Sequence, residues 1–115
     1  MSDVLDLRTL LPAAGETPRQ VALFAFVNLG VIESLSNGLL SSADALRLVF
    51  NADNCLFVRR RLRHKIADEV MSRGVQLSDL FDALPPEEAH REFQRELAKM
   101  RGLCLRLLGG ERVVA

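Results

Sequence analysis

Tryptophan and tyrosine are absent from this 115-residue sequence, and its only aromatic side chains are six phenylalanines. Tyr and Trp are the side chains most used at interaction hot spots and in hydrogen-bonded ligand recognition, because each joins a large apolar ring to a polar group. Their absence removes both of those uses.

Cysteine is almost as scarce, since Cys55 and Cys104 are the only two. Two cysteines cannot form a disulfide-rich scaffold. Both lie in apolar stretches with helical periodicity, which predicts buried, reduced thiols that act as small hydrophobic groups. A disulfide between Cys55 and Cys104 is the alternative.

Long hydrophobic runs are also missing. The longest apolar run covers seven residues, 21–27, and it reaches twelve only if Asn28 and Gly30 are included. A helix that spans a bilayer needs about 20. The N-terminus, Met1-Ser2-Asp3, carries an acid and lacks the basic and then apolar pattern of a signal peptide. We therefore expect a soluble cytoplasmic protein with no membrane partner.

The sequence has no excess of charge of either sign, because 15 Lys and Arg balance 15 Asp and Glu. The overall charge therefore indicates no polyanionic partner. Apolar residues make up 49% of the chain and charged residues 26%, which excludes wholesale disorder. The length suits one domain.

Apolar residues at helical spacing dominate what the sequence does contain. No internal repeat, low-complexity segment or alternating run of β-branched residues is present. This pattern predicts an all-α fold, a compact bundle of four main helices with a short helical turn and an N-terminal arm. The expected limits are an arm over 1–16, one helical domain over 17–110 and a C-terminal tail over 111–115.

The first main helix is predicted over 17–37. Thr17 and Gln20 have the spacing of a capping box, and Pro18 suits the first helical position. Asn37-Gly38 supplies a left-handed stop. The arm before this helix fits either a short helix or an extended segment.

The second and third helices are predicted to be separated by a break at 51–54, with Ser41-Ser42 capping the second and Asp53 the third. Neither Gly nor Pro enforces the break, so one bent helix over 43–73 is an alternative. The third helix should end before Gly74. Its apolar stripe consists of Cys55, Val58, Leu62, Ile66 and Val70.

A short helical turn is expected over 79–84, capped by Ser78, and Pro85-Pro86 separates it from the last helix. Gly109-Gly110 should end that helix. Its apolar residues recur at intervals of four, three, four and three, which predicts a buried seam with basic residues solvated around it. The seam consists of Phe93, Leu97, Met100, Cys104 and Leu107, and the solvated residues are Arg91, Arg95, Lys99 and Arg106.

The first helix is expected to carry the main interaction surface. Leu23 and Phe26 interrupt the face that should be polar, so the middle of the helix is apolar nearly all round. Either the chain's own arm and last helix cover it, or a second subunit does. A membrane-surface helix would need basic flanks, which are missing.

Two further residues of this helix join the predicted interface. Asn28 should satisfy its amide on a backbone carbonyl or pair with the same residue of a second subunit. Gly30 disfavours a helix, so it suggests close approach of another backbone. Leu23, Phe26, Asn28 and Gly30 are the predicted partner interface, and a homodimer is the predicted assembly.

Charge is segregated although it cancels overall. Five basic residues occur within eight positions with no acid among them, and 66–92 then holds seven acids against two arginines. The basic residues are Arg59, Arg60, Arg61, Arg63 and Lys65.

Three interpretations of this basic run are open. In the first it is a solvated helix neutralised locally, since Lys65 is spaced to reach Glu69, and His64 is spaced to reach Asp68. In the second it contacts an acidic protein surface, such as the 66–92 stretch of another subunit. The third is nucleic-acid binding, the alternative function, against which stand the neutral net charge and the lack of stacking aromatics.

Catalytic and metal-binding patterns are weak, and we expect neither an enzyme nor a cofactor. Glu87 and His90 form one Glu-x-x-His, whereas a di-iron bundle needs two such motifs and two more glutamates. Neither cysteine has a neighbour suited to activate it, and no glycine-rich phosphate loop is present. The predicted function is a small protein–protein interaction module for self-association or adaptor binding, and nucleic-acid binding is the alternative. A catalyst or metal carrier built on His64, Asp68, Glu87 and His90 comes third.

Overall fold

A computed structural model describes residues 4–109, in which helices joined by short loops are the only regular elements and no strand occurs. The predicted all-α bundle is therefore confirmed, while Gly110 and the tail predicted over 111–115 lie outside the described residues. The elements are α1 (Leu7–Leu10), the 3₁₀ turn η1 (Pro12–Ala14), α2 (Thr17–Ser36), α3 (Ser42–Leu48), α4 (Ala52–Phe57), the π turn η2 (Val58–Leu62), α5 (Lys65–Gln76), α6 (Asp79–Ala83) and α7 (Pro86–Gly109).

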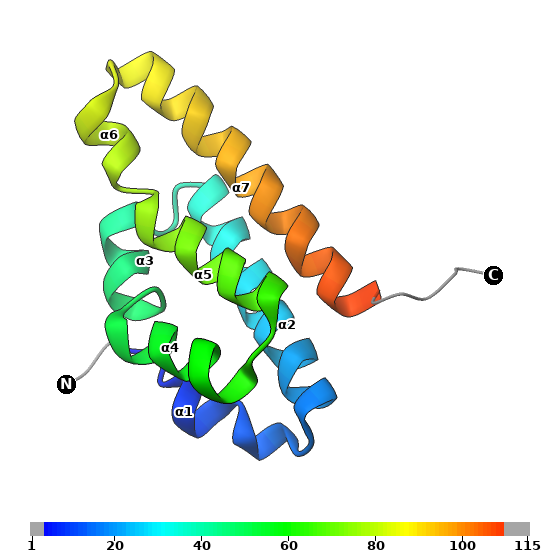
Figure 1. Cartoon of the computed structure of the whole chain (residues 1–115). Helices are drawn as coiled ribbons and strands as arrows, with labels where there is room; N and C mark the ends of the chain where they lie inside the picture. Colours follow the sequence, from blue (N-terminus) through cyan, green and yellow to red (C-terminus); the bar gives the residue numbers. More distant parts are fainter. Residues whose placement is uncertain (1–3, 110–115) are drawn as a thin grey trace.

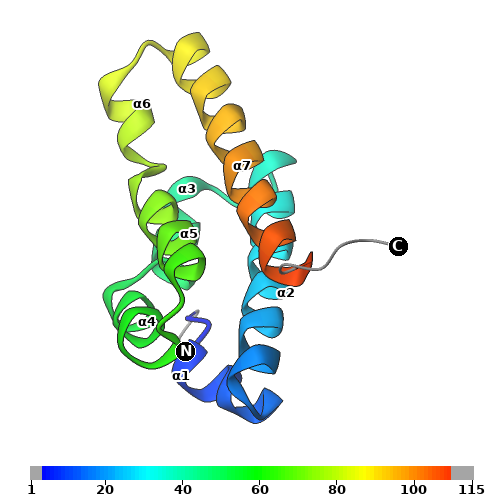
Figure 2. The ribbon, with the colours of Figure 1, turned by 45° about the vertical axis from the view of Figure 1, so that its right-hand side comes forward.

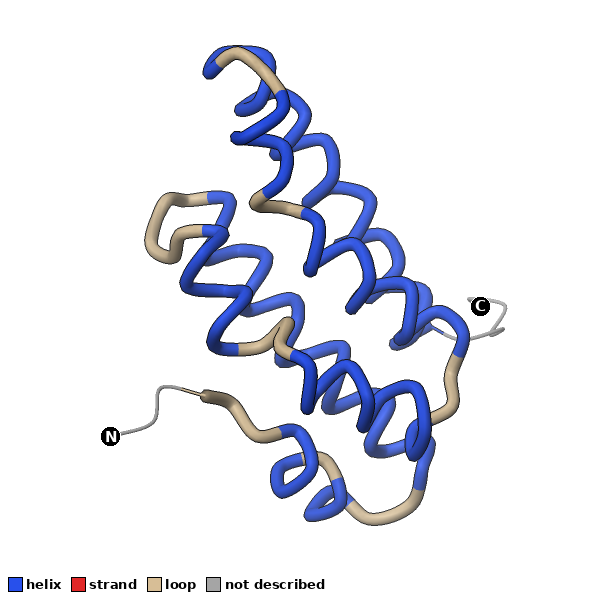
Figure 3. The backbone as a smooth tube through the Cα atoms, turned by 60° about the vertical axis from the view of Figure 1, so that its left-hand side comes forward, coloured by secondary structure: helices blue, strands red, loops and turns tan. Residues whose placement is uncertain are grey.

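The two longest helices, α2 and α7, lie side by side (Figures 1 and 2). The shorter helices α4 and α5 form the opposite side of the bundle, and α1 with η1 closes the end at which α2 begins. The connecting loops are short (Figure 3). The core between these layers includes fully buried side chains from nearly every element, among them Leu7, Leu11, Phe24, Ile32, Phe50, Met71 and Leu97.

The start of α2 differs from the predicted capping box, and its end agrees with the prediction. The N-cap is Glu16, whose side chain makes no capping hydrogen bond, and the Gln20 amide instead donates to the carbonyl of Gly15 at 2.7 Å. Gly15 has φ +103°, which only glycine adopts readily, so it sets the turn that leads into the helix. At the other end Asn37 is the C-cap and Gly38 has φ +74°, as the left-handed stop requires.

The break between α3 and α4 is confirmed, so the alternative of one bent helix is wrong. Ser41 caps α3 as predicted. The chain leaves helical geometry at Val49, and the cap of α4 is Asn51 rather than Asp53. The Asn51 side chain accepts a hydrogen bond from the backbone N–H of Asn54 at 3.0 Å.

The predicted third helix is interrupted at a place that the sequence does not mark. After α4 the chain widens into the π turn η2, and Arg63 then takes a left-handed conformation with φ +52°. A new helix, α5, begins at Lys65 and runs through Gly74 to Gln76. The predicted end before Gly74 is wrong because this glycine lies against the Phe50 ring inside the helix.

The apolar seam of α7 is buried as predicted for Phe93, Leu97, Met100 and Cys104. Leu107 is only half-buried, because in the last turns of the helix it packs at the margin of the core. The four basic residues predicted to surround the seam are exposed. Ser78 precedes α6 without capping it, and its buried hydroxyl has no hydrogen-bond partner.

One buried side chain joins the N-terminal segment to the α3–α4 junction. The Asn54 Oδ1 atom accepts from the backbone N–H of Leu7 at 3.0 Å. Its Nδ2 group donates to the carbonyls of Leu5 at 2.6 Å and Val49 at 2.9 Å. The described part of the arm, residues 4–16, therefore contains a short helix held into the core, with Leu7 and Leu11 fully buried, while residues 1–3 of the predicted arm lie outside the described residues.

We expect Asn54→Asp to lower the free energy of unfolding by about 2–4 kcal/mol, because a carboxylate cannot donate to the two carbonyls and would be buried. Asn51→Asp is the matched control, since aspartate accepts the same capping hydrogen bond and loses only the exposed bond that the Asn51 Nδ2 group donates to the carbonyl of Arg47. Urea denaturation measures both variants. Equal losses would show that the buried amide does not hold this junction.

Two helical glycines give a second matched pair. A Cβ at Gly74 would overlap the Phe50 ring, whereas a Cβ at Gly102 would meet no atom of the described part of the chain within 4 Å. Gly74→Ala should therefore destabilise the protein by about 1–3 kcal/mol through overpacking. Gly102→Ala should stabilise it by about 0.5–1 kcal/mol through helix propensity. Thermal unfolding followed by circular dichroism tests the opposite signs, and a gain in both would contradict the packing at Gly74.

Candidate functional site

The structure divides the four predicted interface residues between two sides of α2. Phe26 is 61% exposed midway along the helix, and Gly30, one turn further on, is exposed as well. Leu23 is half-buried and packs against the edge of the core. Asn28 faces the interior and is completely buried. The outward side of α2 thus presents apolar groups where a polar face is expected.

Asn28 meets its predicted backbone partner, because its Nδ2 group donates to the carbonyl of Phe24 at 3.1 Å. The Oδ1 atom of the same amide is buried without a hydrogen-bond partner. The close approach of another backbone that Gly30 suggests does not occur within residues 4–109, since a Cβ at Gly30 would meet none of their atoms within 4 Å. Gly30 is therefore open to contact from outside.

A leucine of α7 lies on the same side of the α2–α7 pair. The two helices run antiparallel, because Ser36 bonds to Gln94 near the start of α7 and Glu33 pairs with Arg101 further along it at 3.5 Å. Phe26 is seven residues before Glu33, and Leu105 is four residues after Arg101.

Residues at these spacings share a helix face, so Phe26 and Leu105 extend the edge that the Glu33–Arg101 ion pair begins. Leu105 is 54% exposed. Sequence reasoning missed it, although four leucines within 103–108 exceed what one buried stripe can hold.

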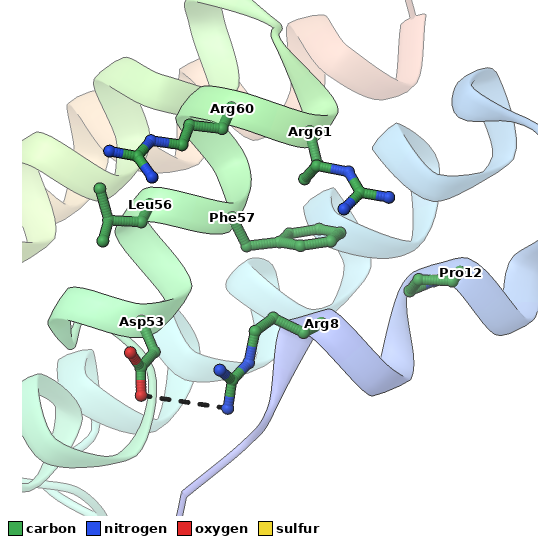
Figure 4. Close-up of a pocket in the computed structure, with 7 residues that line it drawn as sticks. All are labelled: Arg8, Pro12, Asp53, Leu56, Phe57, Arg60 and Arg61. Carbon is green, nitrogen blue, oxygen red and sulfur yellow. Dashed lines mark ion pairs between the residues drawn. The ribbon is translucent and has the colours of Figure 1, made fainter.

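The basic run is also divided, because η2 and Arg63 end the helix on which it was expected. Arg60 and Arg61 line a hollow of about 350 Å³ beside α1 (Figure 4). Arg59, Arg63 and Lys65 line a different hollow, of about 300 Å³.

The local ion pairs differ from those predicted. Asp68 pairs with Arg59 at 3.6 Å, and Glu69 pairs with Arg73 at 2.9 Å. His64 lies before α5 and accepts a hydrogen bond at Nδ1 from the backbone N–H of Ile66, at 3.3 Å. It is therefore not on the same helix as Asp68, which is why the i,i+4 spacing does not bring the two together.

No group of three or more His, Cys, Asp or Glu side chains within residues 4–109 is placed to hold a metal ion. Glu87 and His90 are both exposed. Cys55 and Cys104 are free thiols, so the disulfide alternative is wrong. Cys104 is buried as predicted, whereas Cys55 is only half-buried, at the margin of the core. Burial raises the pKa of Cys104 to about 11 and also raises the pKa of Cys55, which keeps both thiols protonated and weakly nucleophilic at neutral pH.

None of the helices in the described part of the chain is long and apolar enough to cross a membrane. Comparison with protein-family models, with curated proteins and with solved structures finds no match to this chain. The function is therefore inferred from two surfaces alone, the outward side of α2 and α7 and the hollow between α1 and η2.

Proposed function

We propose that this protein is a protein–protein interaction module that forms a homodimer through its α2–α7 face, defined by Leu23, Phe26, Gly30 and Leu105. The exposure of Phe26 carries the proposal, because this residue is 61% exposed at the middle of α2, the second-longest helix. Large apolar side chains gathered on one surface are typical of an interaction site.

Burial of the exposed leucine and phenylalanine supplies the driving force for association. Full burial of a Leu or Phe side chain contributes about 1.5–3 kcal/mol. A two-fold axis places the same patch on both subunits, so each of these side chains is buried twice. The ion pair between Glu33 and Arg101 lies at the edge of this face, where interfaces are usually polar.

A binding role rather than a catalytic one is part of this proposal. The α2–α7 face contains no titratable group among its four defining residues, and both thiols are held protonated by burial. Unpaired cysteines suit a reducing compartment, so we place the protein in the cytoplasm.

We expect Phe26→Asp to convert a wild-type dimer into a folded, helical monomer, because the charge would have to be buried in the interface. Leu39→Asp is the matched control, since Leu39 is 81% exposed in the loop after α2 and outside the α2–α7 face. It should remain dimeric. Sedimentation velocity gives the mass, and circular dichroism confirms the helix content.

Two results would contradict the homodimer. One is a wild-type protein that stays monomeric at high micromolar concentration. The other is an equal loss of mass in Phe26→Asp and Leu39→Asp, which would show that association does not depend on this face. Leu23→Asp is less informative, because Leu23 packs against the core and its substitution should also destabilise the fold.

A further inference from the structure

A hollow at the end of the molecule formed by α1 and α4 combines an apolar floor with basic walls (Figure 4). Its volume is about 350 Å³, within the range of known ligand sites. The floor consists of Pro12, Leu56 and Phe57, and the walls carry Arg8, Arg60 and Arg61. We name this set the arginine pocket.

The arginines of this pocket are not equivalent. Arg8 is neutralised by Asp6 at 3.0 Å, and Asp53 lies 4.0 Å from it on the other side. For Arg60 and Arg61, by contrast, no carboxylate of residues 4–109 lies within 4.0 Å. Two exposed guanidinium groups at the pocket therefore have no ionic partner in the described part of the chain.

The backbone of η2 explains why these two arginines share one pocket. The π turn widens the helix after Phe57, and the left-handed Arg63 then redirects the chain into α5. Arg59 is directed to the other side, where it pairs with Asp68. Single π turns inside helices occur frequently at functional sites.

We propose that the arginine pocket binds an acidic peptide segment of a partner protein, with a bulky apolar side chain of that segment on the floor and a carboxylate at each arginine. In Figure 4 Arg60 extends on the side of Leu56 and Arg61 on the side of the Phe57 ring, and their guanidinium groups point in different directions. Two separate carboxylates suit this arrangement better than one phosphate, which would need the guanidinium groups to converge.

The apolar floor favours an apolar side chain between the two carboxylates of the ligand. Leu56 is 40% exposed, so an apolar side chain can cover it and gain from the burial. Phe57 is only 8% exposed and offers no open ring face for base stacking. These features favour an acidic protein segment over a nucleic acid.

The arginine pocket shares no residue with the α2–α7 face, and α4 lies on the side of the bundle away from α7 (Figure 2). The proposal therefore does not depend on dimer formation. Binding by a monomeric Phe26→Asp variant would leave it intact even if the homodimer were wrong.

The test uses a fluorescein-labelled ten-residue peptide in which glutamates alternate with leucine and phenylalanine, and anisotropy measures its binding to the full chain. We expect saturable binding that weakens as salt is raised. Arg60→Glu combined with Arg61→Glu should weaken it at least tenfold. Arg63→Glu combined with Lys65→Glu is the matched control, with the same charge change on the other side of the turn, and should change the affinity less than threefold. Circular dichroism checks that both variants fold.

Further arms separate the ligand classes. Leu56→Ser, or a peptide with serine in place of its apolar residues, should lose several-fold in affinity, as should a peptide with glutamine in place of glutamate. Equal losses in the two double variants would overturn the proposal, because they would indicate a general polyanion surface. Tighter binding of a single-stranded oligonucleotide, or displacement of the peptide by phenyl phosphate at the same concentration, would also overturn it.

Discussion

The buried amide of Asn54 is the interaction on which most of this small fold depends. Three backbone groups from two distant segments converge on one side chain, and each of its polar atoms is used. Without it, two carbonyls and one N–H would be buried unpaired, which would cost far more than one hydrogen bond contributes. The same contacts bring Leu7 and Leu11 into the core and place Arg8 and Pro12 beside η2. The core and the arginine pocket thus share one polar anchor.

The α2–α7 pair carries the first of the two proposed surfaces. Its helices are joined by core packing and, at their outward edges, by hydrogen bonds between Ser36 and Gln94 and the ion pair between Glu33 and Arg101. Its solvent side presents the exposed side chains of Phe26 and Leu105, while η2 on the other side of the bundle presents Arg60 and Arg61. A chain with no net charge can therefore present one apolar and one basic surface at separate places.

Sequence reasoning recovered the elements whose ends carry local signals. These signals each depend on a few neighbouring residues, and the structure confirms them. They are the Asn37-Gly38 stop, the Ser41 cap and the spacing of the α7 seam. No glycine or proline marks the break at Arg63, so the spacing of the apolar residues predicts one continuous helix through this position. The sequence predicts a helix end at Gly74. The contact that keeps this glycine inside the helix is with Phe50, which lies far from it in the sequence, so local patterns do not reveal it.

The same limit explains the candidate sites. The exposure of Phe26 follows from its place on the helix, which local spacing gives. The position of Arg60 and Arg61 beside α1 does not follow from local spacing. It depends on hydrogen bonds that join Asn54 to Leu7 and Leu5, which lie 47 and 49 positions away along the chain. One wall of the arginine pocket is formed by α1, a four-residue helix that is too short to be stable alone. A ligand held between that wall and η2 would bind only the docked arrangement, so its apparent affinity would be set jointly by the contacts it makes and by the equilibrium between docked and released states of the N-terminal segment.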